Sequence, residues 1–144
     1  MFENGYQQPV GCGHRSGPGT PKGMQDYHKL VVWQRASELT NLVFTATTQF
    51  PRFIDGNLAA QLRRAVVSIA LNISEGCGRK GGADFLRFLQ NAMGSAAEVE
   101  CSIELSRNLG YLDTAASTRL LGHVVETKRM LTGLMKSLGW KSDA

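Results

Sequence analysis

The chain has 144 residues, a length that suits one domain and excludes two catalytic domains. Hydrophobic residues make up 42% and charged residues 19%, which excludes a disordered or supercharged chain and predicts a domain with its own core. The 16 lysines and arginines exceed the 12 acidic residues and give a net charge of +4, which is compatible with an anionic partner but identifies none.

The first 25 residues differ in composition from the rest of the chain. Residues 1–25 contain six of the 16 glycines and three of the four prolines, which predicts a disordered tail. No secretory signal and no stretch of about 20 apolar residues is visible. The three cysteines, Cys12, Cys77 and Cys101, form no C-x-x-C pair and indicate neither a disulfide framework nor a zinc site. We therefore expect a cytoplasmic protein without a membrane segment.

Helical periodicity begins after this tail. The first predicted helix spans about 26–49, and its apolar stripe advances by steps of four and three residues. The stripe consists of Val32, Ala36, Leu39, Val43, Ala46 and Phe50. Pro51 ends this helix because its ring disfavours helical geometry in the preceding residue. The second predicted helix spans about 57–75, with Asn57 as its N-cap and Gly76 after its end.

Two further helices complete the predicted domain. The third spans about 83–109, with the Asp84 carboxylate near the positive end of the helix dipole. The fourth spans about 113–138, and residues 141–144 remain as a short tail. Because no strand-like alternation interrupts the four helices, we predict an all-α, antiparallel up-and-down four-helix bundle over residues 26–140.

Two sets of residues on these helices indicate further contacts. One is a group of small residues within the third helix, where a glycine costs about 1 kcal/mol relative to alanine: Ala92, Gly94, Ser95, Ala96 and Ala97. We expect another helix to approach closely there, from the same chain or from a neighbour. The other set lies off the core stripes and predicts a second apolar face typical of an oligomer: Leu42, Phe44, Phe88 and Leu105.

The sequence carries no motif that indicates catalysis. The segment from Gly76 to Gly81 matches G-x-G-x-x-G, but a dinucleotide site requires a strand before that turn, and here a helix precedes it. The segment is interpreted as a turn between helices. His123 and Glu126 have the reverse order of the Glu-x-x-His motif of di-iron bundles. We expect a non-enzymatic protein with no metal and no cofactor.

The positive charge is concentrated in one part of the chain. Residues 52–87 contain six basic and three acidic residues, a balance of +3, whereas residues 93–113 have a balance of −3. Arginine suits bidentate phosphate contacts, and Arg79 and Lys80 lie in a turn next to a helix N-terminus that helps to hold anions. The candidate nucleic-acid-binding residues are Arg63, Arg64, Arg79, Lys80 and Arg87. Alternatively, the three arginines on the helices pair with acidic residues of neighbouring helices and serve only solubility.

Several motifs in a fixed order resemble a known bacterial family. They are 30–36 (LVVWQRA) followed by Phe50 and Pro51, 61–69 (QLRRAVVSI), 72–79 (NISEGCGR), 84–89 (DFLRFL), 94–100 (GSAAEVE) and 109–112 (LGYL). This is the four-helix-bundle family that includes proteins encoded within intervening sequences of 23S rRNA genes and the accessory variability determinants of diversity-generating retroelements. The resemblance covers roughly residues 27–138.

The resemblance implies a ring-shaped homopentamer without enzymatic activity. It also implies a basic surface, which in the retroelement members contacts nucleic acid and the reverse transcriptase. The matched basic positions are Arg63, Arg64, Arg79 and Arg87. Lys80 is supported by the charge pattern alone. Ser74 replaces a common alanine and Cys77 a common aromatic residue. We therefore expect a nucleic-acid-associated protein, with a protein-interaction scaffold that has no direct nucleic-acid role as the alternative.

Overall fold

The computed structural model describes residues 25–52 and 57–142. The predicted tail at 1–25 therefore lies outside the described residues except for Gln25, and the tail at 141–144 is described only to residue 142. The elements in chain order are η1 (Tyr27–Lys29), α1 (Val31–Ala46), η2 (Thr47–Gln49), α2 (Leu58–Cys77), α3 (Gly82–Asn108) and α4 (Thr114–Ser137). Among the described residues all regular structure is helical, which confirms the predicted all-α class.

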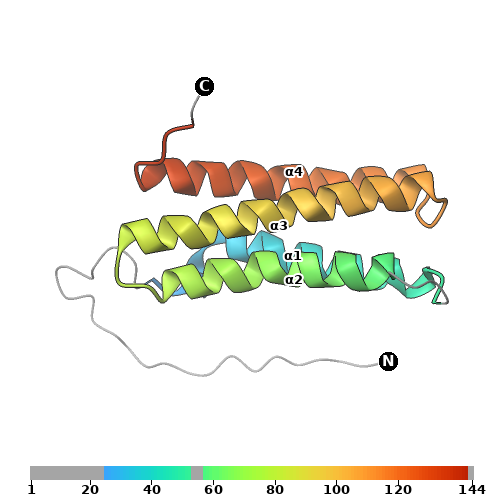
Figure 1. Cartoon of the computed structure of the whole chain (residues 1–144), viewed down its shortest axis with the longest axis horizontal. Helices are drawn as coiled ribbons and strands as arrows, with labels where there is room; N and C mark the ends of the chain where they lie inside the picture. Colours follow the sequence, from blue (N-terminus) through green and yellow to red (C-terminus); the bar gives the residue numbers. More distant parts are fainter. Residues whose placement is uncertain (1–24, 53–56, 143–144) are drawn as a thin grey trace.

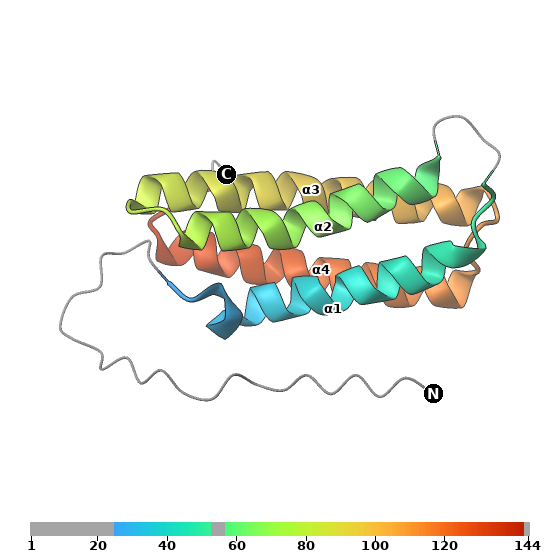
Figure 2. The same ribbon diagram turned by 90° about the horizontal axis from the view of Figure 1, so that it is seen from below.

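The four α-helices lie side by side, and each runs antiparallel to the next (Figure 1). Seen from below, α1 and α2 cover α4 and α3, and the helix ends meet at the two ends of one bundle (Figure 2). Each helix packs against two others, α1 against α2 and α4, and α3 against α2 and α4. The arrangement is an up-and-down four-helix bundle, in which α2 and α3 pack against each other.

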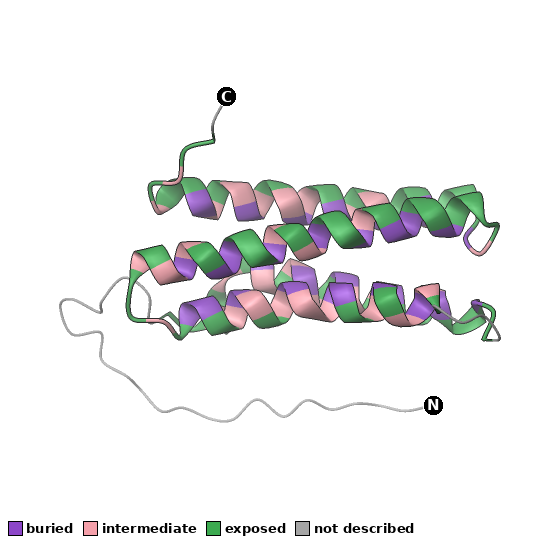
Figure 3. Ribbon diagram, in the orientation of Figure 1, coloured by how far each residue is buried: buried purple, intermediate pink, exposed green. Residues whose placement is uncertain are grey.

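The apolar stripes of the helices meet inside the bundle, and the buried residues face inward (Figure 3). The core includes Leu39 of α1, Leu62 of α2, Phe85 of α3 and Leu131 of α4, each with no exposed surface. On α4 the sequence predicts a stripe of Leu120, Val124, Thr127, Leu131, Leu134 and Leu138. Of these, Leu134 is half-buried, and the neighbouring Met135 takes the buried position. A stripe that repeats every 3.5 residues drifts around a straight helix of 3.6 residues per turn, which explains this one-residue shift.

The first helix differs from the predicted span of 26–49 because it is divided. Leu30 is extended, with φ −79° and ψ 122°, and separates the short η1 from α1. The Asp26 carboxylate caps η1 by accepting a hydrogen bond from the backbone N–H of His28 at 3.1 Å. At the other end Phe50 is extended, with ψ 146°, as the following proline requires.

The second helix continues through Gly76 to Cys77, so Gly76 does not end it as predicted. Gly76 is buried, and a Cβ atom at this position would lie 2.7 Å from Cδ2 of Phe85 and 3.0 Å from Cβ of Phe88. The absence of a side chain at Gly76 therefore allows α2 and α3 to approach each other closely. The physical role of this glycine is spacing between helices rather than termination.

The group of small residues on α3 has a different environment. Gly94 is exposed, and a Cβ atom placed there would meet nothing within 4 Å among the described residues. The expected close approach to this group does occur within the chain beside Gly94, since the Ser95 hydroxyl lies 2.9 Å from that of Ser68 on α2 and Ala92 and Ala96 are buried. At Gly94 itself no described residue approaches, and approach by a neighbouring chain stays a prediction.

The residues of the expected second apolar face do not all lie on the surface. Phe88 is buried and Leu42 half-buried, whereas Phe44 and Leu105 are 41% and 47% exposed. Phe88 is buried because the absent side chain of Gly76 leaves space for it between α2 and α3. None of the described helices is both long and apolar enough to span a bilayer.

Candidate nucleic-acid interface

The five candidate basic residues lie at the two ends of α2. Arg63 and Arg64, the N-terminal pair, occupy its second turn, whereas Arg79, Lys80 and Arg87, the turn cluster, lie at the connection from α2 to α3 and in the second turn of α3. At a rise of 1.5 Å per residue, Arg64 and the last residue of α2, Cys77, are separated by about 20 Å along the helix axis, and the turn cluster follows that end. The basic residues therefore form two groups along one side of the bundle rather than a single patch.

Arg63 is half-buried and holds α2 against the end of α1. Its Nε donates to Oγ1 of the buried Thr47 at 2.7 Å, and its Nη2 donates to the carbonyl oxygen of Phe44 at 3.4 Å. The guanidinium carbon also lies 5.1 Å from the centroid of the Phe44 ring. A positive charge at the carbonyl end of α1 is favoured by the helix dipole. Arg63 thus has a structural role in this contact, which the charge pattern of the sequence did not distinguish from the role of Arg64.

Arg64 and Lys80 differ from Arg63 in being exposed. Neither forms an ion pair or a hydrogen bond with any residue that the structure describes. An anion that binds these two side chains displaces no described partner. They are therefore the members of the two groups that are best placed to contact phosphate.

The two arginines of the turn cluster share one carboxylate. Arg87 donates from Nε and Nη2 to Oδ1 of Asp84 at 3.1 and 2.9 Å, and Nε of Arg79 lies 4.0 Å from Oδ2 of the same residue. Arg79 also donates to Glu75 at 2.9 Å. The side chains in these pairs are 42–56% exposed, so each pair contributes at most about 1 kcal/mol and is readily exchanged for a phosphate.

The buried ring of Phe88 lies beneath both arginines. The guanidinium carbons of Arg79 and Arg87 are 4.7 and 4.5 Å from its centroid. Cation–π contacts of this kind hold the two guanidinium groups over one ring and keep them close together. The sequence did not identify this role of Phe88. The ion pair of Asp84 and Arg87 could have been predicted from the sequence, because the two residues are three positions apart on one helix.

The start of α3 lies within the turn cluster. Its N-cap is Gly81, which is extended and offers no side-chain hydrogen bond to the first turn. The first backbone N–H groups of α3 therefore adjoin Lys80, as expected of a turn that helps to hold an anion. The Asp84 carboxylate occupies the same turn and repels an incoming anion. The site consequently combines attraction by three cations with two opposing carboxylates, Asp84 and Glu75.

The alternative in which the helical arginines pair with acidic residues of neighbouring helices does not match the observed contacts. Arg87 pairs with Asp84 of its own helix, and Arg63 bonds to a hydroxyl and a carbonyl group. Arg79, in the turn after α2, forms an ion pair with Asp84 of α3.

Cys77 lies at the end of α2, next to the turn cluster, and is buried. Burial raises the pKa of its thiol to about 11, and the nearby Asp26 charge adds to this effect. The pKa of Asp26 is lowered because its carboxylate accepts a hydrogen bond from the His28 side chain. A thiol with so high a pKa is protonated at neutral pH and is a poor nucleophile.

The motif from Gly76 to Gly81 begins in the last two residues of α2, and its remaining residues form the turn before α3, which agrees in this part with its interpretation as a helix-connecting turn. No group of three or more His, Cys, Asp or Glu residues that could hold a metal ion occurs in the described ranges.

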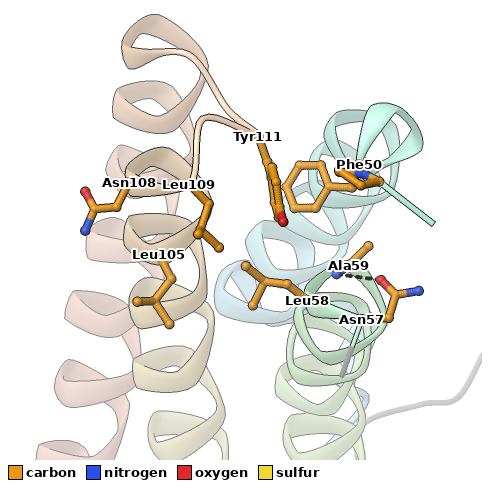
Figure 4. A pocket seen from close by; sticks show the side chains of 9 residues that line it. Phe50, Asn57, Leu58, Ala59, Leu105, Asn108, Leu109 and Tyr111 are labelled. Carbon is orange, nitrogen blue, oxygen red and sulfur yellow. Dashed lines mark hydrogen bonds between the residues drawn. The ribbon is translucent and has the colours of Figure 1, made fainter. Parts of the chain in front are cut away.

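A pocket of about 330 Å³ lies at the far end of the bundle, where α2 begins and α3 ends (Figure 4). It is lined by Phe50, Pro51, Asn57, Leu58, Ala59, Leu105, Asn108, Leu109 and Tyr111. The Phe50 and Tyr111 rings are 5.5 Å apart, and the Asn57 side chain is used as the N-cap of α2 by accepting from the N–H of Ala59. Tyr111 carries the one ionisable group of this lining, so the pocket suits an apolar side chain better than acid–base chemistry.

Comparison with known proteins gives a match to one family model and to several solved structures. The model of the family described as 23S rRNA-intervening sequence protein matches residues 28–133. A solved structure of a protein with unknown function from the S23 ribosomal protein family of Bacteroides thetaiotaomicron VPI-5482 is similar, with a TM-score of 0.67. The two sequences are 22% identical, and the alignment covers 74% of this chain and 99% of that chain. At this identity the likeness shows the fold alone. No curated protein matches the chain.

Proposed function

The chain belongs to the 23S rRNA-intervening sequence protein family, and we propose that it is a non-catalytic, nucleic-acid-associated protein of the cytoplasm. In this proposal it binds RNA or DNA through the two basic groups along α2. The observation that carries the proposal is the exposure of Arg64 and Lys80, which have no partner among the described residues. The weakly paired Arg79 and Arg87 add to them.

The spacing of the two groups supports a polyanionic partner. Phosphates follow one another every 3.4 Å along each strand of a duplex, so the separation of about 20 Å along α2 corresponds to roughly six nucleotides. A single small anion would contact one group only. A nucleic acid contacts both groups at once, and the second contact then forms at a high effective concentration.

The proposal includes a ring-shaped homo-oligomer, with the homopentamer of the family resemblance as its form. Exposed Gly94 and the exposed apolar side chain of Leu105 support a contact between copies. In a ring the two basic groups are repeated in fixed geometry, and the modest charge of one chain becomes a multivalent surface. A reverse transcriptase is the proposed protein partner in a retroelement context, and neither a metal nor a cofactor takes part.

Fluorescence anisotropy with a labelled structured RNA tests the proposal. The purified full chain should bind at low salt, and the affinity should fall steadily as salt is added, because each neutralised phosphate releases counterions. Absence of binding at low salt, or an affinity that salt does not change, would overturn it. Light scattering on the same sample gives the number of chains, and a monomer would refute the ring.

A protein-interaction scaffold is the second candidate, and the pocket of Figure 4 favours it. Leu105 and Leu109 beside this pocket are 47% and 58% exposed, which is typical of a surface that another protein covers. A pull-down from native lysate, repeated after nuclease treatment, distinguishes the two candidates. A partner that remains after nuclease supports the scaffold, and a partner that is lost supports the nucleic-acid function.

A further inference from the structure

A shallow groove lies along the outer face of α2, between the N-terminal pair and Glu75. Its volume is about 500 Å³, within the roughly 300–1,000 Å³ of sites that bind small molecules. The lining combines apolar, basic, hydroxyl and amide side chains with one carboxylate, and its exposed members come from α1 and α2: Phe44, Arg64, Leu71 and Glu75. We call this depression the α2 groove.

An aromatic ring lies at one end of the α2 groove. Arg63 is held over the Phe44 ring by its bonds to Thr47 and to the Phe44 carbonyl, which fixes the guanidinium 5.1 Å from the ring centroid. Phe44 nevertheless remains 41% exposed. A ring that is supported by an arginine and still open to solvent is the kind of surface on which unpaired nucleobases stack.

The middle of the groove continues this apolar surface beside a cation. Leu71 is 60% exposed, and Val67, one turn earlier on α2, is half-buried. Arg64 lies one further turn toward the start of α2, on the same face and without a described partner. A single strand alternates charged phosphates with flat apolar bases, and a groove that combines a free cation with apolar side chains complements both parts.

Asn72 adds a hydrogen-bond acceptor, its amide oxygen, whose orientation is fixed. Its Nδ2 donates to the carbonyl oxygen of Ser68 at 2.9 Å and lies 3.0 Å from the Ser68 hydroxyl. Because a carbonyl oxygen only accepts, this bond fixes the orientation of the amide group. The Asn72 Oδ1 receives no hydrogen bond from the described residues. This oxygen is therefore free to accept a hydrogen bond from water or from a ligand, and RNA offers its 2′-hydroxyl in addition to the N–H groups of its bases.

We propose that the α2 groove binds a short unpaired segment of RNA, with one base on Phe44, the next against Leu71, and a phosphate at Arg64. The inference rests on the proposed function and specifies its ligand as single-stranded rather than duplex RNA. In a duplex the bases are stacked on one another and are unable to reach the Phe44 ring.

The test compares an unstructured RNA oligonucleotide with a fully paired RNA duplex of equal phosphate number, at one salt concentration. Phe44→Leu keeps an apolar side chain and removes the aromatic ring. It should weaken single-strand binding by at least about fivefold, the equivalent of about 1 kcal/mol per stacked base, and leave duplex binding unchanged. Phe44→Trp should retain wild-type affinity, which also shows that loss in the leucine variant does not come from misfolding. Leu109→Ala, at an exposed apolar residue outside the α2 groove, is the matched control.

The possible results separate the two proposals. If wild type binds neither RNA, the proposed function fails. If it binds both and Phe44→Leu weakens neither, or weakens both equally, the α2 groove is not the single-strand site. If DNA of the same sequence binds as well as the RNA, the assignment to RNA is wrong. If Phe44→Leu changes the mass by light scattering and leaves RNA affinity intact, the groove is a contact between copies.

Discussion

Nε of Arg63 donates to the Thr47 hydroxyl at 2.7 Å, across the contact between α2 and the end of α1. Its neighbour Arg64 is exposed and has no bond to any described residue. Two adjacent arginines of the sequence therefore serve different purposes, since the first supports the bundle and the second is available to a ligand.

This difference predicts that two alanine substitutions affect the free energy of unfolding unequally. Arg63→Ala should lower the free energy of unfolding by about 1–2 kcal/mol, because two hydrogen bonds of a charged group are lost. Arg64→Ala should change it by less than about 0.5 kcal/mol. Urea unfolding at one protein concentration measures both. Equal loss of stability in the two variants would show that the Arg63 contacts contribute nothing specific.

Much of the fold could be predicted because core residues recur with the helical period. The division of the first helix could not be predicted, because no proline or glycine marks the extended Leu30 and the apolar stripe begins only after it, at Val32. The position of Gly76 inside α2 depends on the Phe85 ring of the next helix, a contact that no local pattern reveals. In the candidate site the basic positions were visible in the sequence. Which of these side chains already have partners within the bundle could not be predicted, since Arg63 and Arg64 differ only in their tertiary contacts.

Glycine substitutions test the close approach of α2 and α3. Gly76→Ala should destabilise the bundle by about 1–3 kcal/mol, because the new Cβ atom would lie 2.7 Å from the buried Phe85 ring. Gly122→Ala on α4 is the control, since a Cβ atom there meets nothing within 4 Å of the described residues. It should be neutral or stabilise by up to about 1 kcal/mol through helix propensity. Thermal or urea unfolding measures both, and a stabilising Gly76→Ala would contradict the account of this contact.

Burial of Cys77 predicts a loss of stability at alkaline pH. In the unfolded chain the thiol ionises near its ordinary pKa of about 9, whereas in the folded chain it keeps its proton to about 11. Between these values the unfolded state binds fewer protons, so the free energy of unfolding falls as pH rises, by at most about 1.4 kcal/mol per pH unit from this group.

Cys77→Ala isolates this contribution. The variant should show a weaker decline in unfolding free energy between pH 9 and 11 than wild type, although its stability at neutral pH is lower because a buried side chain is shortened. Denaturant unfolding across this pH range gives the comparison. Parallel curves for the two proteins would mean that the thiol does not titrate as described.

The Asp84 carboxylate opposes anion binding in the turn cluster. Its neutralisation is therefore predicted to raise the affinity for RNA. Asp84→Asn releases Arg79 and Arg87 from their shared carboxylate, and RNA affinity at low salt should rise by about two- to fivefold. The same change should lower helix stability by about 0.3–1 kcal/mol, because a carboxylate is lost from the first turn of α3. Glu126→Gln, which breaks an ion pair of Arg129 on α4, should leave RNA affinity unchanged. Unaltered or weaker binding by Asp84→Asn would count against the turn cluster as a phosphate site.

The salt dependence of RNA affinity is the most direct test of binding through the basic groups of α2. The double variant Arg64→Ala with Lys80→Ala should show a shallower slope of log affinity against log salt, by about 0.7–0.9 for each phosphate contact removed. The control is Arg119→Ala with Arg129→Ala, which removes the same charge from exposed positions on α4. The account predicts that the α4 variant keeps the wild-type slope while the α2 variant loses part of it. An unchanged slope in the α2 variant, or an equal reduction in both, would contradict binding through the basic groups of α2.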